Sequence, residues 1–381
     1  MAEGDIGAVI DTSIFDITRG MDPSIVHVSG DVFAVAYTGP DNDGWLCTFT
    51  IDSLGNIGGI IDTLEFDGAD GFLPCIIHVT GNIFAIAYWQ GIGTDDGIVA
   101  TVNIDNLGNI GAAAIDTLTF DAVRGRYPDI IHVSGDIYAI AYRGPGDDGW
   151  LGTVTIDNLG NIGAGFIDTL EFDAVYGSAP SIIHISGDIY AIAYTGPDDD
   201  GWLCTVNIDN LGNIGAAVID TLEYDNLFSN DQRIIHVAGD IYAIAYTRVT
   251  NPGRLCTVDI DNLGNIGAAF IDRVDFEPAF GIRISIVHVS GNVFALAYQG
   301  PDTDGWLRTR SIANDGTIGA AIDSLEFDPT YCDYPHIIYI ERNIYAIAYT
   351  SALGGQGSIK TVDIETYRLP IAQTSPATEI T

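Results

Sequence analysis

Small and bulky residues alternate in a largely apolar phrase that this chain repeats seven times with small changes. The fourth copy runs from Ile189 to Thr195 and reads IYAIAYT. Successive side chains of a strand point to opposite faces. The first, third and fifth residues (Ile, Ala, Ala) therefore form a small face, and the second, fourth and sixth (Tyr, Ile, Tyr) form a bulky one. This pattern predicts β-sheets that stack face to face, roughly 10 Å apart.

The complete repeat predicts four strands. In the fourth copy they cover 181–185, 189–195, 202–209 and 216–225, and short turns rich in Gly, Asn and Asp separate them. We name them strands a, b, c and d in chain order. Ile, Val, Tyr and Thr are abundant in all four. No segment has the period of a helix.

The two ends of the chain predict a closed ring. Residues 6–16 match strand d, whereas the last repeat, 336–365, has strands a to c but no strand d after them. The N-terminal strand then completes the last sheet, which an open solenoid would not require. We therefore predict an all-β, seven-bladed β-propeller of four-stranded antiparallel blades, occupying 1–367 as one domain. Residues 368–381, rich in Pro, Thr and Ser, are expected to be a linker-like tail.

This layout resembles the seven-bladed propellers of the kelch-like and lectin-like type over nearly the whole chain. The resemblance is architectural, because the glycine doublet of kelch repeats and the Gly-His and Trp-Asp signatures of WD repeats are absent. It implies a function at the mouth of the central channel, where propeller enzymes of similar layout often work.

The predicted propeller has two unlike faces. The a–b and c–d turns, such as SGD and NLGNIG, barely change between repeats, which indicates a role in hairpin geometry. The d–a and b–c loops differ from blade to blade. We expect any ligand on this variable face, where arginines and aromatic residues gather. These arginines could equally pair with the many loop aspartates.

One position at the channel mouth holds different residue types in different blades. It directly precedes the apolar pair of strand a and reads Ser24, Cys75, Asp129, Ser181, Arg233, Ser285 and His336. Asp129, Arg233 and His336 could supply an acid, a charge clamp and a base. They belong to blades three, five and seven, so we expect them to meet only across a ligand. The predicted binding residues are Cys75, Asp129, Arg233 and His336, with Arg124, Arg126, Tyr127, Tyr331 and Tyr334 from the loops.

The b–c loop of four blades carries a further motif, GPDDDGWL in the fourth copy, at 196–203. We interpret this motif first as a turn. Its tryptophans, Trp45, Trp150, Trp202 and Trp306, are predicted to lie partly exposed at the rim, which makes the motif next a candidate site for sugar or protein. Its acids are weak calcium candidates: Asp41, Asp43, Asp198, Asp200, Asp302 and Asp304. An EF-hand cannot form, because strand c would carry the closing acid, Asp209, about 20 Å away.

The net charge excludes some classes of partner, and the repetition of certain residues indicates a structural role for them. The formal net charge of −38 argues against nucleic acid and anionic membranes as partners. The six repeated histidines, such as His184, are expected to be hydrogen-bonded core residues. The strand-d aspartate occurs in all seven repeats, as at Asp220, and predicts a structural bond. No phosphate loop, nucleophile elbow or zinc motif is present, and we expect no cofactor other than calcium.

These features favour a non-catalytic binding propeller that recognises a glycan or a protein through its variable face. One alternative is a hydrolase or lyase acting at the channel mouth. Another is a structural or adhesive module of a surface assembly. The Asp-rich, Lys-poor surface suits the cell exterior or the cell surface, and it is also compatible with a cytoplasmic location. The linker-like tail suggests that the domain belongs to a larger multidomain surface protein.

Overall fold

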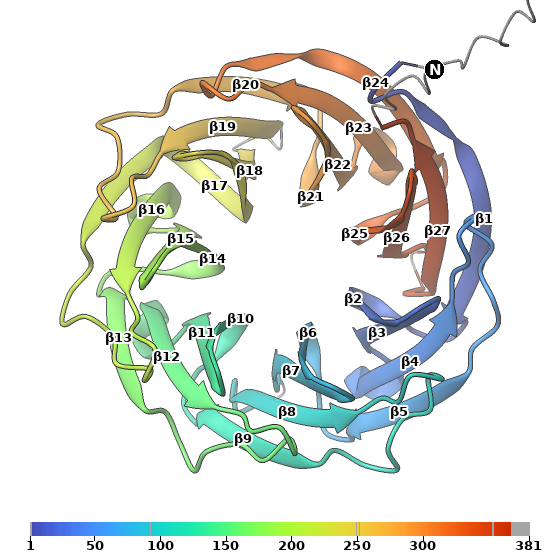
Figure 1. The fold of residues 1–381 in the computed structure, drawn as a ribbon, viewed down its shortest axis with the longest axis horizontal. Helices are drawn as coiled ribbons and strands as arrows, with labels where there is room; N and C mark the ends of the chain where they lie inside the picture. The colour runs from blue at the N-terminus through green and yellow to red at the C-terminus, as the bar shows by residue number, and fades with distance from the viewer. Residues whose placement is uncertain (1, 92, 249, 251, 353, 367–381) are drawn as a thin grey trace, which may run out of the picture.

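A computed structural model describes residues 2–366 except 92, 249, 251 and 353. The predicted tail at 368–381 lies outside the described residues. The chain forms seven blades around a central channel, each made of four antiparallel strands (Figure 1). Helical structure in the described residues is limited to four short 3-10 turns: η1 (Pro40–Asn42), η2 (Pro145–Asp147), η3 (Pro197–Asp199) and η4 (Pro301–Thr303). No helix of the described part is long and apolar enough to cross a membrane.

The blades follow one another in chain order, and each runs from an inner strand a to an outer strand d. Blade one consists of β2 (Met21–Ser29), β3 (Val32–Thr38), β4 (Gly44–Thr50) and β5 (Asp62–Asp67). Blade two consists of β6 (Phe72–Thr80), β7 (Ile83–Trp89), β8 (Gly97–Asn103) and β9 (Asp116–Asp121). Blade three consists of β10 (Arg126–Ser134), β11 (Ile137–Arg143), β12 (Gly149–Thr155) and β13 (Asp168–Asp173). Blades four and five consist of β14 (Ser178–Ser186), β15 (Ile189–Thr195), β16 (Asp200–Asn207) and β17 (Asp220–Ala238), followed by β18 (Ile241–Arg248), β19 (Gly253–Asp259) and β20 (Asp272–Glu277). Blades six and seven consist of β21 (Ile282–Ser290), β22 (Val293–Gln299), β23 (Gly305–Ile312) and β24 (Ile318–Asp328), then β25 (Asp333–Glu341), β26 (Ile344–Thr350), β27 (Gly357–Ile364) and β1 (Ile6–Asp16).

The ring closes as the sequence predicts. The N-terminal strand β1 pairs antiparallel with β27, from Ile6 opposite Ile364 to Asp16 opposite Gly357. One connection differs from the expected loop, because β17 is continuous and serves as strand d of blade four and strand a of blade five. Strand d of blade four also begins at Asp220 rather than at 216, since only an isolated bridge between Ile208 and Ile214 precedes it.

The two unlike faces of strand b pack as expected. Ala191 and Ala193 of β15 are fully buried against Tyr242 and Tyr246 of the next blade's β18. A bulky side chain thus fills the space above an alanine at this blade interface, which gives the dense packing of a protein interior.

Two hydrogen bonds link every neighbouring pair of blades. In the first, a buried strand-c threonine donates to a glycine carbonyl in the next blade's c–d turn, at 2.6 Å in all seven cases: Thr48–Gly108, Thr101–Gly160, Thr153–Gly212, Thr205–Gly264, Thr257–Gly316, Thr309–Gly4 and Thr361–Gly55. In the second, the strand-d aspartate accepts from an isoleucine N–H of the same turn, as Asp220 does from Ile266 at 2.8 Å. The predicted structural role of this aspartate is confirmed.

We expect Thr153→Val to lower the free energy of unfolding by about 1 to 3 kcal/mol, because it leaves the buried Gly212 carbonyl without its donor while keeping a β-branched side chain. Urea unfolding followed by tryptophan fluorescence measures the change. The matched control is Thr169→Val, at an exposed strand-d threonine, which should shift the midpoint little. Equal effects of the two substitutions would contradict a stabilising role for the interblade bond.

Candidate functional site

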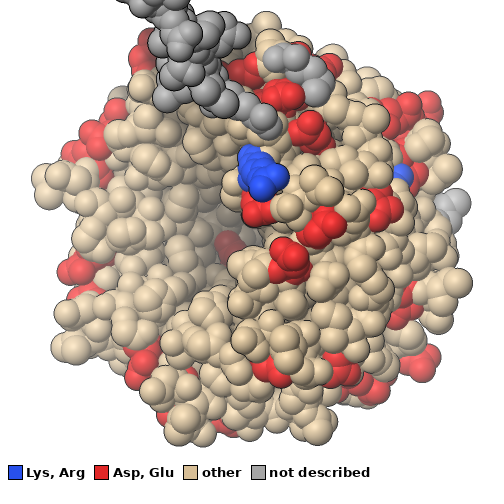
Figure 2. Space-filling model, turned by 45° about the vertical axis from the view of Figure 1, so that its right-hand side comes forward, with Lys and Arg blue, Asp and Glu red and all other residues tan. Residues whose placement is uncertain are grey.

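A cavity of about 450 Å³ lies at the centre of the ring, where the seven inner strands begin. It belongs to the variable face, because each inner strand starts directly after a d–a loop. Figure 2 shows the hollowed centre from one side, with carboxylate side chains spread over the visible surface and few cationic ones. A volume of this size suits a small-molecule ligand.

A repeated backbone bulge turns side chains into this cavity. In blade one, Met21 pairs with Thr38 and Ser24 pairs with Ala36, so Asp22 and Pro23 together face a single residue. A bulge bends its strand and redirects a side chain. The same irregularity occurs in all seven blades, and the residue equivalent to Asp22 has a φ between +46° and +56° in each of them. Non-glycine residues in this region are strained, and such strain gathers at functional sites.

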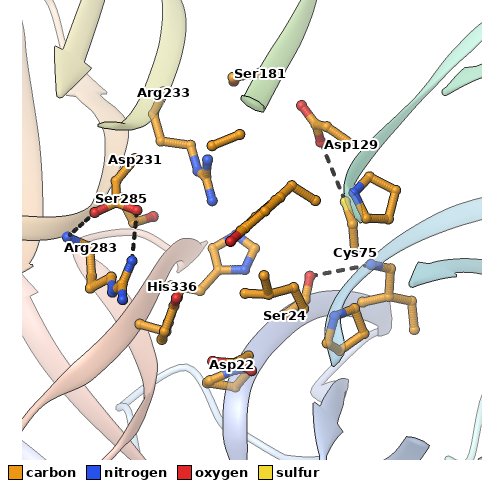
Figure 3. A pocket seen from close by; sticks show the side chains of 18 of the residues that line it. Asp22, Ser24, Cys75, Asp129, Ser181, Asp231, Arg233, Arg283, Ser285 and His336 are labelled. Carbon is orange, nitrogen blue, oxygen red and sulfur yellow. Dashed lines mark hydrogen bonds and ion pairs between the residues drawn. The ribbon is translucent and has the colours of Figure 1, made fainter. Parts of the chain in front are cut away.

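The cavity wall therefore has two rings of seven residues. The first ring consists of the bulge residues Asp22, Leu73, Tyr127, Ala179, Asp231, Arg283 and Tyr334. The second ring consists of Ser24, Cys75, Asp129, Ser181, Arg233, Ser285 and His336 (Figure 3). All seven positions that the sequence singles out at the channel mouth thus line one cavity.

Most second-ring side chains are fixed by the neighbouring blade. Ser24 Oγ accepts a hydrogen bond from the Ile76 N–H at 3.3 Å, and Asp129 Oδ2 accepts one from the Ile182 N–H at 2.9 Å. Ser181, Ser285 and His336 accept equivalent backbone bonds. A guanidinium has no acceptor, so Arg233 cannot join this pattern.

Arg233 instead projects into the cavity. Its side chain is exposed, and its Nη1 donates to the adjacent Gln232 carbonyl at 2.8 Å. Among the residues that the structure describes, no carboxylate forms an ion pair with it. The other cavity arginine, Arg283, pairs with Asp231 at 3.0 Å and lies over the Tyr334 ring. Arg233 is thus free to meet an anionic ligand.

His336 is arranged as a donor, which differs from the expected base. Its Nδ1 accepts from the Ile25 N–H at 3.3 Å, so in the neutral ring the proton lies on Nε2. Burial, and then the charge of Arg233, lower the pKa of His336 to about 4. At neutral pH the imidazole is therefore uncharged and offers an N–H to a ligand.

The side chains of Asp129 and Cys75 form a hydrogen bond between adjacent blades. The Cys75 Sγ donates to Asp129 Oδ1 at 3.5 Å. Burial, and then the Asp129 charge, raise the pKa of the Cys75 thiol to about 12, which keeps it from acting as a nucleophile. Burial also raises the pKa of Asp129, while Arg233 acts in the opposite direction.

The sequence interpretation missed Asp22. This first-ring carboxyl accepts from Thr38 Oγ1 at 3.3 Å, and burial, followed by the charge of Asp333, raises its pKa to about 6. A signal was present, because the position two residues before the second ring varies as much as the second ring does: Asp22, Leu73, Tyr127, Ala179, Asp231, Arg283 and Tyr334. Only the bulge shows that these residues also face the cavity.

The remaining predicted binding residues lie away from the cavity, except Tyr127 and Tyr334, which line it. Arg124 bonds to Asp147, and Arg126 pairs with Asp95 at 2.6 Å, so the pairing that the sequence left open accounts for both. Tyr331 is half-buried and not part of the lining.

The four motif tryptophans are half-buried, as expected for a partly exposed rim position, and each packs against the first glycine of its own b–c loop. A Cβ on Gly196 would lie 2.3 Å from Trp202 Cδ1, so only glycine fits above the indole.

Asp41, Asp198 and Asp302 have φ values of 59° to 60° in the 3-10 turns, and Asp43, Asp200 and Asp304 follow them. The described residues contain no group of three or more His, Cys, Asp or Glu that could hold a metal ion.

The repeated histidines differ from their expected core position. In each of the six, Nε2 donates to the glycine carbonyl of the a–b turn, as from His184 to Gly187 at 2.9 Å. The expected hydrogen bond is therefore present. The side chains are nevertheless exposed, because they lie at the end of the innermost strands, which border the open channel.

Comparisons with known proteins show the fold alone. No protein-family model matches this chain, and no curated protein does. Among solved structures, the periplasmic gluconolactonase of Pseudomonas aeruginosa superposes with a TM-score of 0.58 at 14% identity, over 78% of this chain and 83% of that one. A putative 6-phosphogluconolactonase of Bacteroides fragilis gives 0.57 at 15% identity, over 80% and 84%. A PL25 ulvan lyase bound to -[GlcA(1-4)Rha3S]- gives 0.53 at 12% identity, over 96% of both chains.

We expect Asp22→Asn to stabilise the protein at pH 7 by up to about 3 kcal/mol. The folded pKa of about 6 exceeds the ordinary 3.8, so between these values the folded state keeps a proton that the unfolded state has lost. Stability from this group is complete below pH 4, falls as the pH rises to 6, and is constant above. Asparagine cannot ionise, so the gain should vanish below pH 4.

Urea unfolding at several pH values measures this dependence. The control is Asp231→Asn, which removes the partner of Arg283 and should destabilise the protein at pH 7. A loss of stability in Asp22→Asn at pH 7 would show that the carboxylate is not an unfavourable charge.

Proposed function

We propose that the central cavity binds a small acidic sugar, with Arg233 as the group that takes its carboxylate. The observation that carries the proposal is the exposed guanidinium of Arg233, which lies in the cavity without an ion-pair partner among the described residues. A guanidinium matches a carboxylate through paired, charge-assisted hydrogen bonds. On a chain with a formal net charge of −38, a free cation in a cavity is chemically distinct from its surroundings.

The rest of the lining suits hydroxyl groups. Asp22 and the neutral His336 offer an acceptor and a donor, and Tyr127 and Tyr334 add aromatic surface. Apolar and aromatic walls with a few placed polar groups are typical of sugar-sized sites. Carbohydrate-related names among the similar folds, a gluconolactonase and a lyase bound to a glucuronate-containing sugar, agree with this chemistry.

Binding, rather than turnover, is the function that the geometry supports best. The Nδ1 of His336 and both oxygens of Asp129 already accept hydrogen bonds. His336 is therefore not placed to take a proton from a substrate, as general base catalysis requires, and Asp129 is held against the cavity wall by the Ile182 N–H and the Cys75 thiol. We further propose an extracellular setting, which a ligand of this class and an Asp-rich surface both favour.

The direct test is the affinity for D-glucuronate by isothermal titration calorimetry. Arg233→Ala should weaken binding by about 10- to 100-fold, the range expected for charge-assisted hydrogen bonds. Arg124→Ala removes a loop arginine that is paired outside the cavity and should bind like the wild type. If Arg233→Ala keeps its affinity, or if both variants lose it equally, the cavity does not use Arg233 as the carboxylate clamp.

One observation favours a hydrolase or lyase as a second candidate. The Asp22 carboxyl lines the cavity, and its pKa of about 6 suits proton transfer near neutral pH. Turnover of an aldonolactone or of a uronate-containing polysaccharide that disappears in Asp22→Asn, with glucuronate binding retained, would support this function. Turnover that persists in Asp22→Asn would exclude Asp22 as the acid or base.

A further inference from the structure

The face opposite the cavity carries an arc of exposed leucines. The c–d turns of five consecutive blades each present one leucine, and its exposed fraction is 65% to 68%: Leu54, Leu107, Leu159, Leu211 and Leu263. A single exposed leucine is ordinary on a protein surface. Five equivalent ones on consecutive blades form a repeated apolar feature that the fold places on one face.

The turn itself does not require leucine. In blade six the equivalent residue is Asp315, and the glycine that follows it, Gly316, has the same φ of +86° as Gly55 and Gly212. In blade seven the equivalent residue is Glu3, followed by Gly4 at +87°. Because an acid builds the same turn, hairpin geometry does not explain the leucines.

Each leucine has an apolar neighbour from the preceding blade. A Cβ on Gly108, the residue after Leu107, would lie 2.7 Å from Ile61 Cδ1, so this isoleucine abuts the turn. The equivalent isoleucines, Ile10, Ile61, Ile115, Ile167 and Ile219, are themselves 38% to 41% exposed. The arc thus holds five leucine–isoleucine pairs, each at a junction between blades, in which the isoleucine abuts the turn that carries the leucine.

The pairs are held in fixed positions. The carbonyl of the glycine after each leucine accepts the 2.6 Å bond from the neighbouring blade's threonine, as Gly108 does from Thr48. Within the turn, Asp105 accepts from the backbone of Leu107 and Asn109, each at 2.9 Å. A surface ordered before binding loses little conformational freedom when a partner docks.

The negative charges beside the leucines indicate which kind of partner can dock on the arc. A carboxylate lies two residues before each leucine, and hydrogen bonds from the turn asparagine, first of all its side chain, lower the pKa of each one: Asp52, Asp105, Asp157, Asp209 and Asp261. The leucines therefore alternate with negative charges. A second copy of this chain, or an anionic membrane, would be repelled by a molecule of net charge −38.

We propose that the leucine arc is a docking surface for a basic protein whose apolar face is flanked by lysine or arginine. Its apolar residues pack on the leucine–isoleucine pairs, and its basic residues meet the turn aspartates. Five linked contacts add through their effective concentration even when each is weak. This surface lies on the face opposite the cavity, so the protein could hold a partner and a small ligand at the same time.

The probe is a synthetic amphipathic peptide of leucine and lysine, with binding followed by fluorescence anisotropy. The triple variant Leu107→Asp, Leu159→Asp and Leu211→Asp uses the residue that blade six already has in this turn. We expect it to bind the peptide at least about tenfold more weakly, although its added carboxylates should attract lysine. An all-lysine peptide should bind the triple variant as tightly as the wild type, or more tightly.

The matched control is Val123→Asp with Val175→Asp, at exposed valines of the d–a loops on the cavity face, and it should leave peptide affinity within twofold. A triple Leu→Asn variant at the same three positions guards against a folding defect and should lose affinity as well. Unchanged or tighter peptide binding by the triple Asp variant would overturn the proposal. So would leucine-dependent sedimentation of the wild type with phosphatidylcholine vesicles, or its leucine-dependent self-association, because either would identify a different occupant.

Discussion

The hydrogen bond from a buried strand-c threonine to a glycine carbonyl of the next blade is the contact on which this structure depends. It occurs at every blade junction, including the one that joins the two ends of the chain through Thr361 and Gly55. With the strand-d aspartate it fixes each c–d turn against its neighbour. A ring locked in this way at its outer strands holds the inner strands in register, and the cavity lies where those inner strands begin.

The locked ring allows unlike residues to share one site. The backbone bulge at the start of strand a is the same in all seven blades, and only the side chains that it presents differ. Asp22, Arg233 and His336 come from blades one, five and seven and still line one cavity. Strain and an unfavourable carboxyl at this place lower stability, as is common where residues serve binding rather than folding. On the opposite face, the same repetition places an equivalent exposed leucine in the c–d turns of five blades.

Much of the architecture could be predicted from the sequence, and the limits of that prediction have physical causes. The alternation in 189–195 defines β15 at both ends, because strand period and turn residues are local signals. The orphan strand at 6–16 predicted ring closure correctly. The second ring was found through variation within an otherwise constant phrase. Asp22 was missed because a bulge, which depends on strand pairing, turns it inward. The pairing of Arg126 and the exposure of His184 depend on neighbouring blades and on the open channel, which no local pattern contains.

Arg233 is proposed to receive the carboxylate of a sugar acid in the cavity. A crystal structure of the protein soaked with D-glucuronate tests it most directly. We predict density for the sugar in the cavity, with its carboxylate within hydrogen-bond distance of the Arg233 guanidinium and a hydroxyl near His336 Nε2. Sugar density only on the outer loops, or in the cavity with its carboxylate turned away from Arg233, would contradict it.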